Sequence, residues 1–223
     1  MKVAFITDVH VTTKNLASGA ADILDRAAAA IVESGAELCL IGGDLAGYSV
    51  PHRVTPDERN AILALVVRVR RHMPVVVIRG NHDSHGEWDF LGALDQVWYA
   101  DQPGMIRLDA ADVIVLPWID EARLPPHDDY ATALLDYYES RMLELAGRPK
   151  KPVFVLVHGA FVASMIREGQ PAVPTKDPIL DVDDLVDRLL GGDGLQKLEA
   201  VARHQHRDRK STRLNSSHDQ RSR

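Results

Sequence analysis

The sequence has 223 residues, and 45% of them are hydrophobic, which is enough for a sizeable packed core in one domain. Of the net charge of −6, residues 207–223 contribute +4, which leaves −10 for residues 1–206 and argues against broad, non-specific binding of nucleic acid. No apolar run could span a bilayer, and the N-terminus lacks the pattern of a secretory signal. With a single cysteine, Cys39, no disulfide can form within the chain, so we expect a cytoplasmic protein that does not enter a membrane.

Strand-like apolar runs alternate with amphipathic, helix-like segments along the chain. In chain order we expect a strand at Lys2–Thr7, a helix at Ala17–Ser34, a strand at Glu37–Ile41, a helix at Pro56–His72, strands at Pro74–Ile78, Met105–Leu108 and Asp112–Leu116, a helix at Tyr130–Ala146, a strand at Val153–Val157 and a helix at Asp181–Leu190. Short, continuous β-branched runs are typical of strands that are buried on both faces. The alternation predicts an α/β fold in which helices pack against a central sheet.

Polar residues with metal-binding side chains directly follow four of the predicted strands. These clusters are Asp8-Val9-His10, Gly42-Gly43-Asp44, Gly80-Asn81-His82-Asp83 and His158-Gly159. In open α/β sheets the carboxyl ends of the strands share one edge, and ligands bind in the crevice there. Side chains that are distant in sequence can therefore converge at that edge.

The local details suit metal binding. Asp8 and His10 have the same parity, so they project to one side while the chain stays extended. Gly42 and Gly43 permit a sharp turn before Asp44, whose two carboxylate oxygens can bridge two cations. Amide oxygens suit hard cations, and imidazoles suit manganese, iron, zinc or nickel. Each cluster alone also fits an ordinary turn, a helix cap or a hydrogen-bonded histidine, so the prediction rests on all four together.

In this order the four clusters resemble the motifs of the calcineurin-like metallophosphoesterases. That family ends its pattern with Gly-His-x-His, and the corresponding place here reads Arg203-His204-Gln205-His206, with arginine where glycine is expected. The resemblance extends from Lys2 to about His206. It implies a layered metallophosphoesterase fold, with central mixed β-sheets flanked by helices. The domain would cover residues 1–206 and be incomplete at its C-terminus.

The resemblance also implies a role for each matching residue. One metal ion would be held by Asp8, His10, Asp44 and His206, and a second by Asp44, Asn81, His158 and His204, with Asp44 bridging. The two divalent ions are expected to be manganese, with iron, zinc or nickel as alternatives. His82 would be the catalytic imidazole near the leaving-group oxygen, and Asp83 the partner that orients it. Two such cations can activate water for an in-line attack on phosphorus.

The run Gly80–Ser84 most resembles the SbcD-type DNA-repair nucleases within the family. This resemblance implies a phosphodiesterase or exonuclease that acts on DNA ends, forms a homodimer and works beside a coiled-coil ATPase partner of the SbcC type. Two alternatives stay open. One is a phosphatase or small-molecule phosphodiesterase on the same scaffold, and the other is a non-catalytic interaction scaffold. The second is opposed by the complete set of Asp8, His10, Asp44, Asn81, His82 and His158.

Residues 207–223 are polar and lack hydrophobic periodicity, so we expect them to be a disordered tail. From Asp208 the run resembles the translation of a sequencing adapter. We therefore expect a native chain that continues past about His206 with a different sequence, and a natural tail is the alternative. Neither interpretation adds a function.

Overall fold

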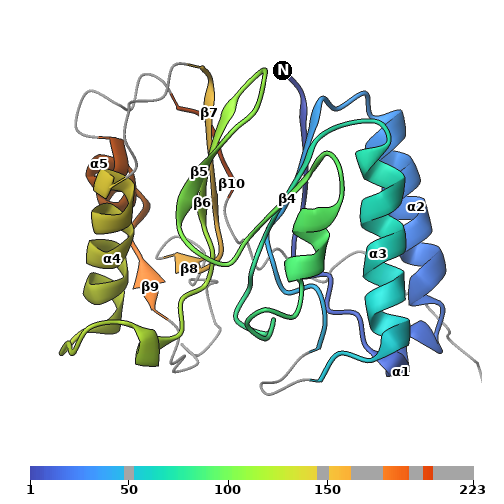
Figure 1. Ribbon diagram of the computed structural model, residues 1–223, viewed down its shortest axis with the longest axis horizontal. Helices are drawn as coiled ribbons and strands as arrows, with labels where there is room; N and C mark the ends of the chain where they lie inside the picture. The colour runs from blue at the N-terminus through green and yellow to red at the C-terminus, as the bar shows by residue number, and fades with distance from the viewer. Residues whose placement is uncertain (48–52, 145–150, 162–177, 191–197, 203–223) are drawn as a thin grey trace, which may run out of the picture.

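The computed structural model describes residues 1–47, 53–144, 151–161, 178–190 and 198–202. Within these residues two β-sheets lie face to face, and helices cover the outer face of each sheet (Figure 1). The layers therefore follow the order helix, sheet, sheet, helix. This arrangement confirms the predicted α/β class with flanking helices. The alternation of elements predicted one central sheet, whereas the described residues form two facing central sheets, as the family resemblance implied.

The first sheet has four parallel strands in simple chain order. They are β1 (Val3–Ile6), β2 (Leu38–Ile41), β3 (Val75–Ile78) and β4 (Val97–Ala100). The connections contain α1 (Thr13–Leu16) and α2 (Ala20–Glu33), then α3 (Pro56–Arg70), then the 3-10 helix η1 (Asp89–Ala93). Crossovers of one hand between strands in this order place the helices on a single face of the sheet. The opposite face is left for the second sheet.

The second sheet is mixed and has the order β10, β7, β6, β5. In it β5 (Gly104–Arg107) and β6 (Asp112–Leu116) form an antiparallel hairpin, and β7 (Val153–Val157) pairs in parallel with β6 and with β10 (Leu198–Ala202). The outer layer contains α4 (Tyr130–Glu144) and α5 (Val182–Leu190), which are joined by an ion pair between Arg188 and Asp136. The 3-10 helix η2 (Glu121–Arg123) precedes α4, and β8 (Ala160–Phe161) pairs with β9 (Ile179–Leu180).

Alternate residues of the inner strands face different cores. The layer between the two sheets contains Leu38, Leu40, Val76, Ile78, Val113, Val115, Phe154 and Leu156. Their neighbours in sequence face the helices instead: Cys39, Ile41, Val75 and Val77 on the side of α2 and α3, and Ile114, Leu116, Val155 and Val157 on the side of α4. These strands are therefore buried on both faces, as their continuous apolar runs predicted.

The N-terminus of α3 also fixes the segment that follows β1. Thr55 and Glu58 form a reciprocal capping box, and Pro56 occupies the first turn, so the helix begins where the sequence predicts. The buried Glu58 carboxylate accepts a second hydrogen bond, at 2.6 Å, from the main-chain N–H of Thr13. The chain just beyond His10 is thus attached to the outer helix layer.

Several short elements are not predicted by the sequence patterns. They are α1, β4, β8, β9 and β10, each of five residues or fewer. Such segments offer too few residues for a periodicity to show. In the described part of the chain, no helix combines the length and the apolarity that a membrane crossing needs.

Candidate metal centre

Three predicted ligands lie together at the carboxyl ends of β1 and β2. Asp8 and His10 follow β1, Asp44 follows β2, and each offers a ligand atom within 4.8 Å of the others. Nε2 of His10 lies 3.6 Å from Oδ1 of Asp8 and 3.5 Å from Oδ2 of Asp44. Atoms that share one cation at about 2.0–2.2 Å are themselves about 3.0–3.5 Å apart. The three side chains therefore need little movement to hold one ion.

Asn81 and His158 extend this cluster to the second sheet. Asn81 lies in the loop after β3, and His158 directly follows β7. Nε2 of His158 is 3.6 Å from Oδ1 of Asp44 and 3.0 Å from the side-chain amide of Asn81. Asp44 thus turns one carboxylate oxygen toward His10 and the other toward His158. The four strand ends belong to two facing sheets, which corrects the prediction of a single shared edge.

The backbone at the first three ligands is left-handed. Asp8, His10 and Asp44 have φ angles of 54°, 47° and 54°. Such angles cost a non-glycine residue about 1–3 kcal/mol each and concentrate at functional sites. Main-chain hydrogen bonds from Asp8 to Gly43 and from His10 to Asp44 hold the two turns against each other. The chain is therefore not extended at Asp8 and His10. The two side chains are brought together by paired turns, so the prediction that they share one side of an extended strand was wrong.

Two glycines are required by this close approach. Gly43 has a φ of 93°, which favours glycine and confirms the predicted sharp turn before Asp44. At Gly80 an added Cβ would lie 2.2 Å from Oδ1 of Asp44, so any side chain there would displace the carboxylate. A Cβ at Gly43 would lie 2.6 Å from the main-chain nitrogen of Gly80. The turns after β2 and β3 therefore interlock backbone to backbone.

His82 lies beside the first three ligands. Its ring is 5.1 Å from the ring of His10, in an edge-on arrangement, and its main-chain N–H donates to Oδ1 of Asp44 at 2.9 Å. Nδ1 of His82 is buried and has no hydrogen-bond partner among the described residues. The ring is thus close to the cluster, and within the described residues no carboxylate accepts a hydrogen bond from its Nδ1.

Asp83 has a different position from the one expected of a partner for His82. Its buried carboxylate accepts hydrogen bonds from the main-chain N–H groups of Asp44, Leu45 and Gly80 at 2.8–2.9 Å and from the indole of Trp88 at 3.2 Å. Four donors face its two oxygens, which is the environment of an ionised carboxylate. Asp83 therefore braces the turns after β2 and β3 from behind, and this corrects its predicted role.

The pKa values at the centre reflect burial against hydrogen bonding. Burial lowers the pKa of His10. The side chain of Asp8, the carbonyl of Gly47 and the charge of Asp44 together raise it by more, so the pKa of His10 lies above its ordinary value. Burial raises the pKa of Asp83, and the charge of Asp44 adds to this, while the main-chain N–H groups that it accepts from oppose the change. The charge of Asp44 contributes to both shifts, and a cation bound beside this carboxylate would offset that charge.

Two residues that the sequence analysis did not single out adjoin the centre. The ring of Trp118, just beyond β6, lies edge-on to His158 at 6.3 Å. The buried side chain of Arg79 reaches the same segment and forms an ion pair with Asp120 at 3.0 Å. The sequence feature that could have identified one of them is the charge of Arg79, which stands between a buried strand and Gly80.

The predicted ligands His204 and His206, and Arg203 beside them, lie outside the described residues.

Proteins similar to this chain are found among solved structures and among families of sequences. Two solved structures are similar in part. The first is Yfce, a phosphoesterase from E. coli, with 22% identity, a TM-score of 0.32, and coverage of 51% of this chain and 56% of the Yfce chain. The second is AQ665 from Aquifex aeolicus, described as a protein of unknown function, with 14% identity, a TM-score of 0.36, and coverage of 83% and 92%. A search of curated proteins gives no significant match.

The sequence profile described as calcineurin-like phosphoesterase matches residues 1–192. The chain belongs to this family. Members of the calcineurin-like phosphoesterase family hydrolyse phosphoesters with divalent metal ions, and the match covers Asp8, His10, Asp44, Asn81 and His158. This membership confirms the predicted metallophosphoesterase fold.

The residues present fit the divalent metals of the calcineurin-like family. Nδ1 of His10 lies 2.5 Å from the carbonyl oxygen of Gly47, and Nδ1 of His158 lies 2.6 Å from that of Gly42. Because a carbonyl only accepts, each neutral ring carries its proton on Nδ1 and leaves the Nε2 lone pair to the cluster. A carbonyl behind the ring is the usual support of a metal-binding histidine.

The amide of Asn81 adds a second indication of a cation. The atom that lies 3.0 Å from Nε2 of His158 is also 3.1–3.2 Å from both carboxylate oxygens of Asp44. As an oxygen, this atom faces two other oxygens, a contact that a cation between them makes favourable. With the amide turned over, its NH₂ group donates to the same carboxylate. The arrangement therefore suits a bound ion, and the amide can satisfy Asp44 when no ion is bound.

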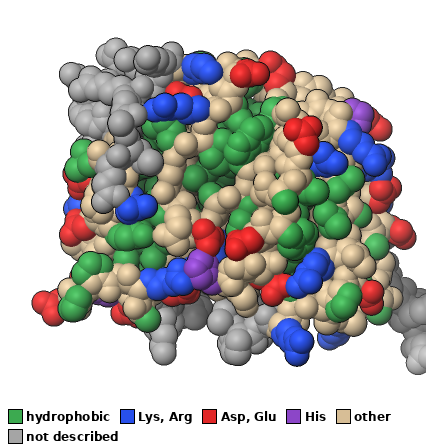
Figure 2. Space-filling view, in the orientation of Figure 1, with side chains coloured by type: hydrophobic (Ala, Val, Ile, Leu, Met, Phe, Trp, Pro, Cys, Tyr) green, Lys and Arg blue, Asp and Glu red, His purple; other side chains and the backbone are tan. Residues whose placement is uncertain are grey.

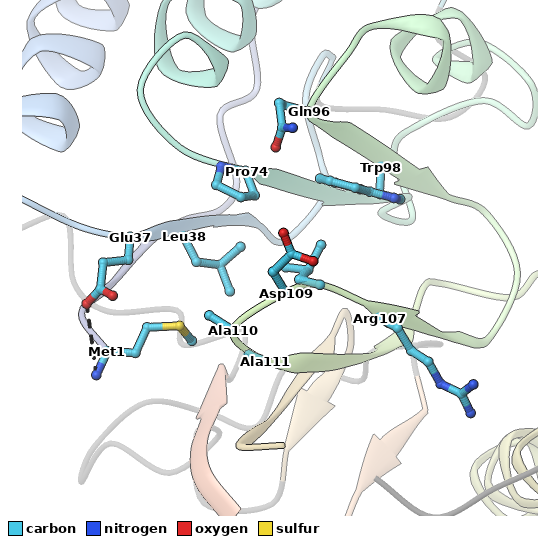
Figure 3. A pocket seen from close by; sticks show the side chains of 11 residues that line it. Met1, Glu37, Leu38, Pro74, Gln96, Trp98, Arg107, Asp109, Ala110 and Ala111 are labelled. Carbon is cyan, nitrogen blue, oxygen red and sulfur yellow. Dashed lines mark ion pairs between the residues drawn. The ribbon is translucent and has the colours of Figure 1, made fainter. Parts of the chain in front are cut away.

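A separate pocket lies at the other end of the two sheets, beside the starts of β2, β3 and β4 (Figure 3). Its volume is about 220 Å³. Leu38, Pro74 and Trp98 form its apolar part on the side of the first sheet. The charged residues that line it are Glu37, Arg107 and Asp109, without an imidazole. This pocket lacks the grouped carboxylates and imidazoles of the metal centre.

Proposed function

We propose that this chain is a phosphodiesterase that uses a pair of divalent cations, with manganese as the resident metal. The observation that carries the proposal is the position of Asp44, between Nε2 of His10 and Nε2 of His158. A carboxylate that faces two imidazoles, each supported at Nδ1 by a carbonyl, is suited to hold two cations at once. Mixed oxygen and imidazole ligands agree with manganese, and with iron, zinc or nickel.

The chain's own residues would divide the chemistry between positioning and proton transfer. When bound, the two cations would supply Lewis-acid activation of a water molecule and of the phosphoryl oxygens. His82 would give a proton to the leaving-group oxygen, and this role is supported by its ring, which adjoins His10, and by its main chain, which is fixed to Asp44. General-acid help of this kind contributes about 10²–10⁴ in rate. Asp83 would act only by holding the turns that carry Asp44 and Gly80.

Among phosphodiesters we propose DNA ends as the substrate, on the resemblance of Gly80–Ser84 to SbcD-type nucleases. The same resemblance supports a homodimer and a coiled-coil ATPase partner. On the face shown in Figure 2, basic side chains are interspersed with acidic ones over both halves of the molecule. Two cations in the centre would attract phosphates locally without a basic stripe.

The central test measures hydrolysis of bis-p-nitrophenyl phosphate with and without added manganese. We expect turnover that depends on the metal, and we expect a loss of about 10²–10⁴ in kcat for His82→Ala while bound manganese is retained. His72→Ala, which removes an exposed imidazole at the end of α3, is the matched control and should behave like the wild type. A folded protein that takes up no manganese, iron, zinc or nickel would exclude the proposed function.

A second assay separates the substrate classes. Linear duplex DNA, a nucleotide monoester and a phosphoprotein would be compared at equal concentration in manganese. We expect preferential release of nucleotides from DNA ends. Preferential cleavage of the nucleotide or the phosphoprotein would instead favour a phosphatase on the same scaffold. Full metal binding with no turnover on any of these substrates would favour an interaction scaffold.

A further inference from the structure

The metal centre is divided between two sheets that share no strand. Asp8, His10, Asp44 and Asn81 come from turns of the first sheet, whereas His158 comes from the second. The first group is held together by its own turns, through Asp83 and the main-chain hydrogen bonds. The separation between Asn81 and His158 needs a different restraint, because it depends on how the sheets meet.

Arg79 supplies hydrogen bonds across this boundary. It directly follows β3, and its guanidinium donates to the main-chain carbonyl of Trp118 at 2.5 Å and to the carboxylate of Asp120 at 3.0 Å. It also donates to the carbonyl of Asp83 at 3.3 Å. In return, the main-chain N–H of Trp118 donates to the carbonyl of Arg79 at 3.0 Å. The end of β3 is thus fixed to the segment after β6 by both main chain and side chain.

The segment after β6 in turn supports His158. The main-chain N–H of His158 donates to the carbonyl of Leu116, the last residue of β6, at 3.1 Å. The ring of Trp118 lies edge-on to the ring of His158. Arg79, which precedes Asn81 by two residues in the chain, is therefore connected through Trp118 and the segment after β6 to His158. A second link across the boundary is the hydrogen bond between Nδ1 of His158 and the carbonyl of Gly42.

We propose that Arg79 is a positioning residue that sets the separation of Asn81 and His158, and hence the affinity of the second metal. This inference rests on the proposed two-metal function. The side chain of Arg79 is only 3% exposed, so the guanidinium is held in a costly environment close to a site for cations. Its charge alone opposes metal binding, because like charges repel at short range. A favourable effect of Arg79 on the metals must therefore come from its geometry.

The two effects predict opposite results for Arg79→Met. Loss of the positive charge alone would tighten manganese binding. Loss of positioning would weaken the second site, and residues that support metal ligands typically change affinity about 10- to 100-fold. We expect the second dissociation constant to rise by that factor and the first to stay within about twofold. Arg79→Lys, which keeps the charge but cannot reach all three acceptors, should give an intermediate value.

The measurement is a titration of the full 223-residue chain with manganese, followed by calorimetry and by the electron paramagnetic resonance signal of the coupled pair. Arg68→Met is the matched control, because it removes an arginine that pairs with Asp25 on the outer helices and should leave both affinities unchanged. Asp120→Ala removes only the half-exposed partner and should weaken the second site about two- to fivefold. This variant and Arg79→Lys keep the test decisive if Arg79→Met does not fold.

The outcomes separate this inference from the proposed function. A wild-type chain that binds fewer than two manganese ions would exclude the two-metal function and the inference together. The wild type could instead bind two ions while the folded Arg79 variants weaken both sites equally. That result would show a general loss of structure, and it would overturn the inference but not the proposed function. Unchanged or tighter second-site binding would do the same. Selective weakening that matches the site lost in His158→Ala supports the assignment.

Discussion

The two sheets contribute to the metal centre in different ways. At the first sheet, Asp8, His10 and Asp44 adopt left-handed backbone conformations in turns that interlock through Gly43 and Gly80. At the second sheet, His158 simply continues a buried strand, without a positive φ. The strain is therefore confined to the turns that must place several ligands around one point. A single ligand needs only a strand that ends in the right place.

This difference divides the centre into a preformed half and an added half. The carboxylate of Asp83 accepts four hydrogen bonds that brace the turns after β2 and β3, and main-chain hydrogen bonds from Asp8 and His10 attach the turn after β1 to them, so the fold itself groups the candidate ligands Asp8, His10 and Asp44. Under the proposed two-metal function, the second ion would depend on contact between the sheets. Three predictions test this division and a fourth tests the core behind the first sheet, from the largest expected effect to the smallest.

Asp44→Ala removes the residue that belongs to both halves. We expect loss of both metal ions and a fall in turnover of at least about a thousandfold, because residues that act as a unit fail together. Metal content after gel filtration and kcat on bis-p-nitrophenyl phosphate measure the two effects. Retention of one tightly bound ion would show that Asp44 does not bridge.

His158→Ala removes the ligand of the second sheet alone. We expect one bound manganese instead of two, with the first affinity within about threefold of the wild type and turnover reduced about 10- to 100-fold. His10→Ala is the comparison, because it should weaken the first ion. If His158→Ala also releases the first ion, the division between the sheets is wrong.

Asp83→Asn tests the brace of the preformed half. An asparagine turns its NH₂ group toward two of the four N–H donors, so buried donors lose their acceptor, and we expect a destabilisation of about 1–3 kcal/mol. Urea unfolding of the metal-free protein measures it. Asp22→Asn, at an exposed position of α2, is the control and should change stability little. A stability equal to the wild type would mean that the turns are held by other contacts.

Cys39 reports on the core behind the first sheet. Burial raises the pKa of its thiol from 9.0 to about 12. Because the folded state binds this proton more tightly than the unfolded state, the contribution to stability is complete below pH 9 and is lost as the pH rises toward 12. At pH 10 the loss is about 1.4 kcal/mol. The difference in unfolding free energy between the wild type and Cys39→Ala, measured from pH 8 to pH 10, checks it. A difference that does not change with pH would contradict the buried, protonated thiol.

The strands and ligands nearest to strand ends were predictable from the sequence, and the contacts across loops were not. Apolar runs such as Val75–Ile78 mark buried strands, and the polar residues after them mark the centre. Left-handed turns at Asp8 and His10 give no local pattern, because main-chain bonds to Gly43 and Asp44 impose them from 34 or more positions away. The role of Asp83 was also predicted wrongly, as a partner that orients His82, because two of its four hydrogen-bond donors are distant in sequence and leave no local pattern. These two N–H groups belong to the turn after β2, so they can be identified only once the turns after β2 and β3 pack together in the fold.

The alternation of β2 between two buried layers determines which mutations this strand can tolerate. Its four residues alternate between two apolar layers, and Asp44 follows only three positions after the last of them. Exchanges among aliphatic side chains in this strand are tolerable, at less than about 1.5 kcal/mol when volume is conserved. Insertion or deletion of one residue would exchange the two faces and carry Asp44 out of its place between the imidazoles. Variation among descendants of this chain should therefore alter the composition of β2 freely while its length stays fixed.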